Sequence, residues 1–197
     1  MQLSCICVFC GSSPGADPAF KDVAGLLGAE LGRRGIRLVY GGGRVGLMGL
    51  LADSALQAGG EVRGVITKAL KDKEIGHLGL TSLRVVATMH ERKAAMAVDA
   101  DAFIMLPGGF GTLDEFFEAL TWTQLGIHAK PCGILNIGGF FDPLLELFEA
   151  ATRQRFIRAE HRDMIVVEAD PSSMIEQLEA WVPVTVVKWL DNGELAP

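Results

Sequence analysis

The sequence has 197 residues, of which 49% are hydrophobic, and this suits one domain, residues 1–197, with a sizeable core. The formal net charge of −6 excludes a general basic surface, so we expect no nucleic-acid partner. The chain has no apolar stretch of roughly 18 residues and no N-terminal pattern of a signal peptide, which predicts a cytoplasmic protein without a membrane partner.

Short apolar runs alternate with amphipathic segments of helical length, as is typical of a parallel sheet covered by helices on both faces. We expect helices to begin at Pro18, near Gly46, at Met89 and after Pro171. Residues 68–81 combine glycine with mixed charge, which predicts a loop or broken helix that could form a flap over a site. The apolar runs predict strands at residues 3–9, 36–40, 61–66, 83–87, 102–106, 132–136 and 164–168.

Three of the four cysteines, Cys5, Cys7 and Cys10, lie in or just after the first apolar run, and Cys132 lies in another. Their spacing suggests a metal or iron–sulfur site. Alternation along a strand, however, puts Cys5 and Cys7 on one face and leaves Cys10 at the strand end. No second cluster follows, so we expect buried thiols in a reducing compartment and no metal.

Residues 107–115 (PGGFGTLDE), here called the third turn, directly follow the fifth apolar run and indicate a strand, a phosphate-binding loop and a helix. Three glycines within four residues let the backbone turn sharply and approach a ligand. Thr112 is expected to cap the helix, whose unsatisfied amides attract an anion. Glu115 could complement the helix dipole, worth about 0.3–1 kcal/mol. Beside a phosphate, however, a carboxylate is unfavourable unless it acts on another part of the ligand, which suggests catalysis.

Two other glycine turns are expected at the same edge of the sheet. The first turn, residues 11–13, follows the first strand, and the second turn, residues 41–46, follows the second strand. Ligands of open parallel sheets bind beyond the carboxyl ends of the strands, where strand order reverses. Glycine at any one of these turns could serve the chain reversal alone, but three together predict a shared site.

The second turn also matches the GxGxxG pattern through Gly41, Gly43 and Gly46, which alone would indicate NAD. A dinucleotide turn belongs after the first strand, with an acidic residue at the end of the next strand. Here the turn follows the second strand, and Glu61 begins the third strand instead of ending it. This context argues against an oxidoreductase.

The second and third turns, with residues 89–93 (MHERK) and 121–128 (TWTQLGIH), resemble the LOG (Lonely Guy) family. Its members are cytokinin riboside 5'-monophosphate phosphoribohydrolases, often labelled lysine decarboxylases. The resemblance implies an α/β fold, a Rossmann-like doubly wound parallel sheet of about seven strands with helices on both faces. It also implies a homodimer without a cofactor. The implied reaction hydrolyses the N-glycosidic bond of N6-modified adenosine 5'-monophosphate or AMP, releasing free base and ribose 5-phosphate.

By the match of motifs, the resemblance implies that Arg92 and Glu115 form the catalytic pair. It also implies a substrate site that draws on all three turns, on the flap and on the helix after the third turn. The predicted substrate-binding residues are Gly11, Ser12, Ser13, Gly41, Gly42, Gly43, Glu74, Lys93, Gly108, Gly109, Phe110, Gly111, Thr112, Leu113, Asp114 and Thr121.

The residues suit this chemistry. Breaking a ribosyl C–N bond builds positive charge on the sugar, and a carboxylate such as Glu115 could stabilise that charge or align water. Arg92 could assist the leaving base or orient Glu115, and the sequence leaves both roles open. The 5'-phosphate is expected on the amides of Gly109, Gly111 and Thr112.

Two alternatives belong to other classes. A binding or carrier protein would hold a nucleotide or a phosphorylated cofactor without hydrolysing it. A pyridoxal-dependent decarboxylase would need a Schiff-base lysine, and no lysine stands out for that role.

We expect surface or core roles for the four histidines, His77, His90, His128 and His161, because their spacing suits no metal.

Overall fold

The computed structural model describes residues 2–74 and 76–184. Its strands match the seven predicted apolar runs to within two residues at each end, and helices begin at Pro18, Gly46, Met89 and Pro171 as expected. The strands are β1 (Cys5–Phe9), β2 (Arg37–Tyr40), β3 (Val62–Thr67), β4 (Ser82–Val86), β5 (Ala102–Met105), β6 (Cys132–Leu135) and β7 (Ile165–Glu168). The helices are α1 (Pro18–Arg33), α2 (Gly46–Gln57), α3 (Lys68–Glu74), α4 (Met89–Asp99), α5 (Phe110–Gln124), α6 (Asp142–Arg153), α7 (Ala159–Arg162) and α8 (Pro171–Ala180), with a 3-10 turn η1 (Ile137–Gly139).

The seven strands form one parallel sheet in the order β4-β3-β2-β1-β5-β6-β7. Cys7 of β1 pairs with Val39 of β2 on one side and with Phe103 of β5 on the other. The chain therefore builds outward from β1 to β4 and then returns to β5 on the opposite side of β1. This reversal confirms the predicted Rossmann-like doubly wound sheet and places its switch point between β1 and β5.

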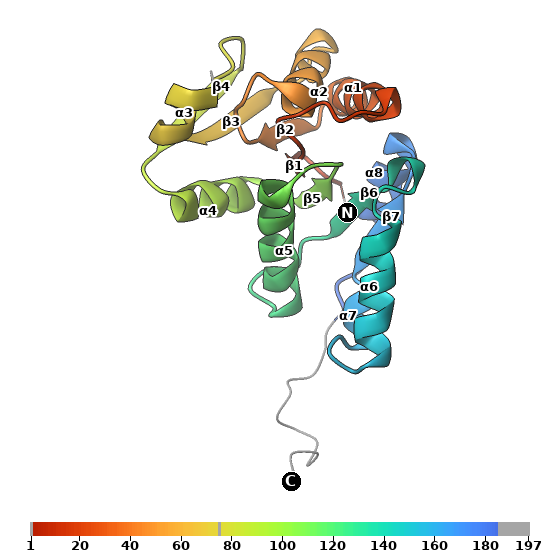
Figure 1. The fold of residues 1–197 in the computed structure, drawn as a ribbon. Helices are drawn as coiled ribbons and strands as arrows, with labels where there is room; N and C mark the ends of the chain where they lie inside the picture. The colour runs from red at the N-terminus through yellow and green to blue at the C-terminus, as the bar shows by residue number, and fades with distance from the viewer. Residues whose placement is uncertain (1, 75, 185–197) are drawn as a thin grey trace.

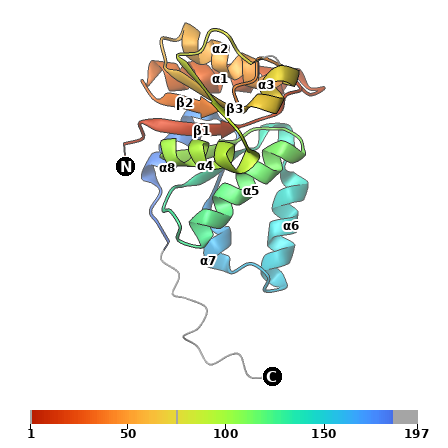
Figure 2. The same cartoon turned by 90° about the vertical axis from the view of Figure 1, so that its left-hand side faces the viewer.

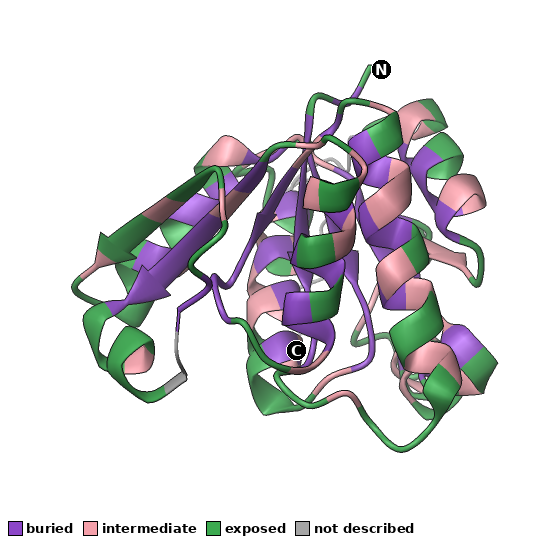
Figure 3. Ribbon diagram, turned by 90° about the horizontal axis from the view of Figure 1, so that it is seen from above, coloured by how far each residue is buried: buried purple, intermediate pink, exposed green. Residues whose placement is uncertain are grey.

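Helices cover both faces of the sheet, with α1 and α2 above it and α4 and α5 below it in Figures 1 and 2. The upper core joins the sheet to α1, α2 and α8 through residues such as Leu27, Leu51 and Ile175. The lower core joins it to α4, α5 and α6 through residues such as Met96 and Phe116. Figure 3 shows buried residues concentrated in the strands and in the inward faces of the helices. Both faces of the central strands are thus removed from water, whereas the edge strand β4 stays largely exposed.

Capping residues fix where the helices α1 and α4 begin. At α1, the Asp17 carboxylate accepts the Ala19 amide proton at 2.9 Å, and Pro18 takes the first helical position. At α4, the Thr88 hydroxyl accepts the Glu91 amide proton at 3.1 Å. This cap fixes the first turn of α4, which carries Arg92.

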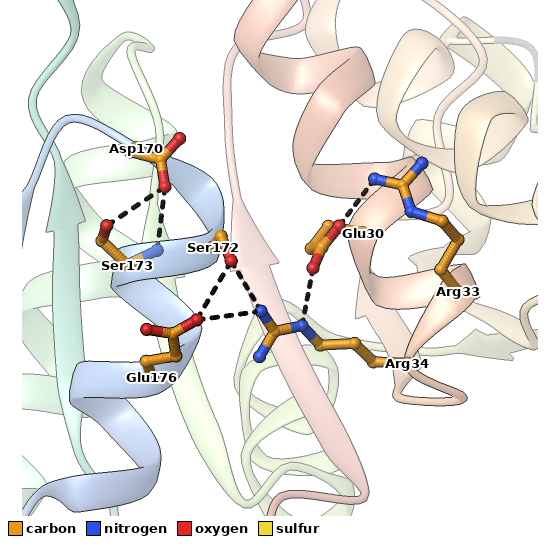
Figure 4. A network of polar contacts seen from close by, with 7 residues as sticks. All are labelled: Glu30, Arg33, Arg34, Asp170, Ser172, Ser173 and Glu176. Carbon is orange, nitrogen blue, oxygen red and sulfur yellow. Dashed lines mark hydrogen bonds and ion pairs between the residues drawn. The ribbon is translucent and has the colours of Figure 1, made fainter.

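Polar contacts connect the end of α1 to α8, as Figure 4 shows. The Arg34 guanidinium donates to Glu30 and to Ser172, each at 2.7 Å, and lies 3.4 Å from the Glu176 carboxylate. Hydrogen bonds from Arg33 and Arg34 hold the pKa of Glu30 below its ordinary value. These contacts join elements 138 residues apart in the chain, at the periphery of the upper helical layer.

None of the helices within the described ranges is both long and apolar enough to cross a membrane. The prediction for residues 68–81 is confirmed in its broken-helix form, because α3 covers residues 68–74, residues 76–81 are not helical, and β4 begins at Ser82.

Close packing of α1 on α2 predicts a stability difference between two glycine variants. A methyl group added at Gly28 would lie 2.2 Å from the Leu51 carbonyl oxygen, whereas one at Gly25 would meet only the Ser54 hydroxyl, at 3.4 Å. Gly28→Ala should destabilise the protein by about 2 kcal/mol, because the two helices must separate. This lowers the melting temperature by roughly 4–8 °C. Gly25→Ala is the matched control and should be neutral or stabilising by up to about 1 kcal/mol. Thermal unfolding followed by circular dichroism checks both, and equal melting temperatures would contradict the packing argument.

Candidate functional site

The three glycine turns meet at the carboxyl edge of the sheet, as predicted. The Gly11 amide donates to the Pro107 carbonyl at 3.0 Å, which joins the first turn to the third. The Leu47 amide donates to the Gly11 carbonyl at 3.1 Å, which joins the start of α2 to the first turn. A side chain at Gly46 would lie 2.3 Å from the Ser12 backbone, so only glycine allows this approach.

A cavity of about 290 Å³ opens beside this junction. Residues Gly11, Ser12, Ser13, Gly108 and Gly109 all line it, which brings five predicted substrate-binding residues together. Two aromatic side chains that sequence analysis missed complete the wall. They are Phe20 of α1 and Phe140, whose rings meet edge to face at 5.5 Å. No motif marks either residue, because they reach the cavity only through the packing of α1 and η1.

The start of α5 corrects one prediction. Thr112 does not cap the helix, because α5 begins at Phe110 and its N-cap is Gly109, without a side-chain hydrogen bond. Thr112 is buried inside the first helical turn, and its hydroxyl occupies the space that a side chain at Gly108 would need. Gly109 has the extended backbone that is usual for an N-cap residue. The amides of residues 110–112, which have no intrahelical carbonyl, therefore stand at the cavity edge.

Arg92 and Glu115 form a buried ion pair. Arg92 Nη1 donates to Glu115 Oε1 at 2.7 Å, and the two side chains are only 8% and 11% exposed. Arg92 Nε also donates to the Val65 carbonyl at 2.9 Å, and Nη2 donates to the Gly41 carbonyl at 3.2 Å. All three guanidinium nitrogens are thus engaged, and their planar geometry fixes the Glu115 carboxylate in one orientation.

The second turn is shaped to receive Arg92. A methyl group on Gly41 would lie 2.3 Å from Arg92 Nη2, and Gly42 has a φ of +76°, in the region that favours glycine. The hydroxyl of buried Tyr40 donates to the Gly43 carbonyl at 3.1 Å. The glycines of this turn therefore serve contacts inside the protein, and two of them are required by sterics.

Lys93 lies beside Arg92 in sequence but faces other carboxylates. Its ammonium nitrogen is 3.1 Å from Asp114 and 3.0 Å from Glu118, both on α5. Burial alone would lower the pKa of Lys93, but hydrogen bonds to Glu118 and Asp114 outweigh it and raise that pKa. Lys93 is therefore a stable cation that joins α4 to α5, directly beside the Arg92–Glu115 pair.

The other predicted residues spread along α5 and α3. Phe110 is 92% exposed at the start of α5, and Leu113 packs against the lower core. Thr121 is exposed and donates to the Phe117 carbonyl at 2.6 Å. It lies about 16 Å along the helix from Phe110, so one copy of the chain does not bring it to the third turn. Glu74 ends α3, but its side chain is outside the described part of the structure.

All four cysteines are buried and free. Cys5 and Cys7 face the lower core and Cys10 lies at the end of β1 in the upper core, as the alternation predicted. Burial raises the pKa of the Cys7 and Cys10 thiols, and the Glu115 carboxylate adds to the effect. Both thiols stay protonated at neutral pH. Within residues 2–74 and 76–184, no three His, Cys, Asp or Glu side chains are grouped to hold a metal ion.

Known structures share this fold. The molybdenum cofactor binding protein from the phototrophic bacterium Rippkaea orientalis superimposes with a TM-score of 0.69, covering 91% of this chain and 98% of its own. The two sequences are 24% identical, so the likeness concerns the fold alone.

Known sequences are much more similar. The family model described as "Possible lysine decarboxylase" matches residues 48–178. "Probable cytokinin riboside 5'-monophosphate phosphoribohydrolase LOGL1" of Oryza sativa subsp. japonica is 51% identical over 176 residues, covering 89% of this chain and 79% of that protein. "Cytokinin riboside 5'-monophosphate phosphoribohydrolase LOG1" of Arabidopsis thaliana is 48% identical over 178 residues, covering 90% and 84%. This chain, with the glycine turns and the arginine–glutamate pair that its motifs predicted, belongs to the LOG family.

Proposed function

We propose that this protein hydrolyses the N-glycosidic bond of N6-modified adenosine 5'-monophosphates and releases the free cytokinin base and ribose 5-phosphate. The observation that carries the proposal is the buried Arg92–Glu115 pair beside the junction of the three turns. Relatives 48–51% identical over 89–90% of the chain are named for this activity.

The 5'-phosphate of the substrate would sit at the start of α5. The amides of Gly111 and Thr112 belong to the first turn of the helix, where the positive end of the helix dipole attracts an anion. Ser12 and Ser13 line the adjoining cavity and would supply hydroxyl donors. Held by its phosphate, the ribose would be presented to a fixed carboxylate, and this positioning lowers the entropic part of the barrier.

Glu115 would act on the ribose. As the C–N bond breaks, positive charge grows on the sugar, and a carboxylate with little exposure to water stabilises that charge strongly. The same group can accept a proton from the attacking water, whose oxygen bonds to the ribosyl carbon. The base nitrogen that loses the C–N bond takes a proton, so water is the only co-substrate.

Arg92 would orient Glu115 instead of contacting the leaving base. Its three guanidinium nitrogens donate to Val65, Glu115 and Gly41, all within the protein. A group engaged in this way has little freedom to follow the base during the reaction. Of the two roles that the sequence leaves open, this geometry supports the orienting one.

We also propose a homodimer. Lys130 donates to the Ala97 carbonyl at 2.7 Å, so the end of α4 lies beside the segment that follows α5. Around this contact Val98, Leu125 and Ile127 are 78%, 63% and 64% exposed, and together they are called the α4–α5 patch. A second copy would cover the patch. It would also bring a second Thr121, the predicted site residue that lies far from the third turn of its own chain.

The proposal also covers the substrate range, the domain organisation and the cellular location of the protein. We propose that plain AMP is also cleaved, that residues 1–197 act as one domain, and that the protein works in the cytoplasm without a cofactor. Comparison of AMP with isopentenyladenosine 5'-monophosphate at equal concentrations ranks the two substrates.

The catalytic pair predicts a defined loss of activity. Glu115→Gln keeps the size of the side chain but removes its charge, so kcat should fall by about 10²–10⁴-fold. Arg92→Lys keeps a charge but loses the three-way contact, so kcat should fall by roughly 10- to 100-fold. Released base is measured by chromatography with isopentenyladenosine 5'-monophosphate. Glu146→Gln, an exposed carboxylate on α6, is the matched control and should match wild type.

Two outcomes of that experiment decide between hydrolase and carrier. Base release by wild type and control, with loss in the two site variants at a temperature where circular dichroism shows each variant still folded, supports the hydrolase. A folded wild-type protein that binds the nucleotide and returns it intact would contradict the proposal and favour a carrier.

The dimer proposal is tested by charge placed on the α4–α5 patch. Val98→Asp should weaken self-association by roughly 10- to 100-fold, because an unpaired carboxylate would be buried in the contact. Leu147→Asp on α6 places the same charge at a similarly exposed apolar residue, 61% exposed, and serves as the control. Light scattering coupled to gel filtration measures the mass of each. A monomeric wild type, or equal masses for wild type and Val98→Asp, would refute this interface.

A further inference from the structure

The segment between α3 and β4 is fastened to the second turn by His77. The His77 amide donates to the Gly42 carbonyl at 3.0 Å, and Gly76 forms an antiparallel bridge with Gly43. The His77 side chain is only 8% exposed, although Leu78 and Gly79 after it are exposed. Of the surface and core roles that the sequence left open for His77, the structure shows the buried one.

The imidazole of His77 makes two further contacts that determine its tautomer. Nδ1 accepts the Gly79 amide proton at 3.1 Å, so Nδ1 carries no proton. Nε2 then bears the hydrogen and donates to Asp53 Oδ1 at 3.0 Å. Asp53 lies on α2, the helix that begins directly after the second turn. The ring thus links the segment to a rigid element on the opposite side of that turn.

His77 and Arg92 bind neighbouring carbonyl groups of the second turn. The carbonyls of Gly41, Gly42 and Gly43 accept hydrogen bonds from Arg92, His77 and Tyr40 respectively. Because Gly41 and Gly42 share a peptide plane, a displacement at Gly42 also moves the carbonyl that Arg92 binds. In the other direction along the chain, α3 ends at Glu74, three residues before His77.

We propose that the Asp53–His77 pair is a positioning device for the substrate site. It holds the second turn against Arg92 and holds the segment between α3 and β4 against that turn, at the edge of the substrate site. His77 is a positioning residue, since it acts through the second turn and α3. This inference rests on the proposed function, and it assigns to His77 and Asp53 a role in substrate binding that no motif indicates.

Four variants test the pair. His77→Ala removes both ring contacts, and Asp53→Ala removes the acceptor on α2. His77→Gln is the conservative variant, because its amide can still donate to Asp53. Asp22→Ala, an exposed carboxylate on α1, is the matched control for Asp53→Ala. Steady-state kinetics use isopentenyladenosine 5'-monophosphate, and amide hydrogen exchange is followed in residues 40–46 and 76–80.

We expect His77→Ala to raise KM about tenfold, because both ring hydrogen bonds are lost, while kcat changes by less than roughly threefold. The smaller change in kcat follows because Val65 still holds Arg92. Asp53→Ala should also raise KM, but by a smaller factor, because the Asp53 side chain is 56% exposed and water can replace part of its contact. His77→Gln should stay within about threefold of wild type in KM. Exchange in both segments should quicken in His77→Ala and stay at the wild-type level in the control.

The results that would overturn the positioning role of His77 differ from those that would overturn the hydrolase proposal. An unchanged KM in His77→Ala, or a fall in kcat alone that follows the folded fraction, overturns the positioning role while the hydrolase proposal stands. If wild type releases no base, the hydrolase proposal fails. Equilibrium binding of AMP to the same variants then replaces KM, and equal dissociation constants for wild type and His77→Ala overturn the inference.

Discussion

The guanidinium of Arg92 is the interaction on which the arrangement of the site depends. It joins the first turn of α4 to the carbonyl of Val65 at β3, to the second turn at Gly41, and to Glu115 on α5. These four elements come from separate parts of the chain, and the Arg92 side chain joins them. Breaking a buried ion pair by removing one partner costs about 3–5 kcal/mol, so these elements are held in register.

A buried charge pair is a poor device for stability alone. An arginine and a glutamate lose their hydration on burial, and apolar side chains of similar size would stabilise a core at least as well. Here the desolvation of Arg92 is offset by two backbone carbonyls, and the carboxylate that results is rigid and weakly solvated. Such a carboxylate suits the stabilisation of positive charge better than the stabilisation of a fold.

Glycine makes this arrangement possible where the turns converge. A methyl group at Gly41 would collide with Arg92, and one at Gly46 would collide with the first turn. The parallel sheet brings these turns together because β1 and β5 are neighbours, although Ile6 and its partner Ala102 are 96 positions apart in the chain. The cavity lies at the same edge of the sheet, so the point where the strand order reverses is also the candidate substrate site.

The sequence by itself determined the seven strands, the starts of four helices, the meeting of the three turns and the pairing of Arg92 with Glu115. The strands, helix starts and turns follow from apolar periodicity and from proline and glycine, whereas the Arg92–Glu115 pair was implied by the resemblance of its motifs to the LOG family. Tertiary structure decided the rest. Thr112 lies inside the first turn of α5 because the helix begins at Phe110, and Phe20 and Phe140 reach the cavity because α1 packs beside η1. His77 is buried where its segment pairs with the second turn and its ring contacts Asp53. In each case the position of a side chain depends on how separate helices, strands and turns pack together, and a local sequence pattern does not encode that packing.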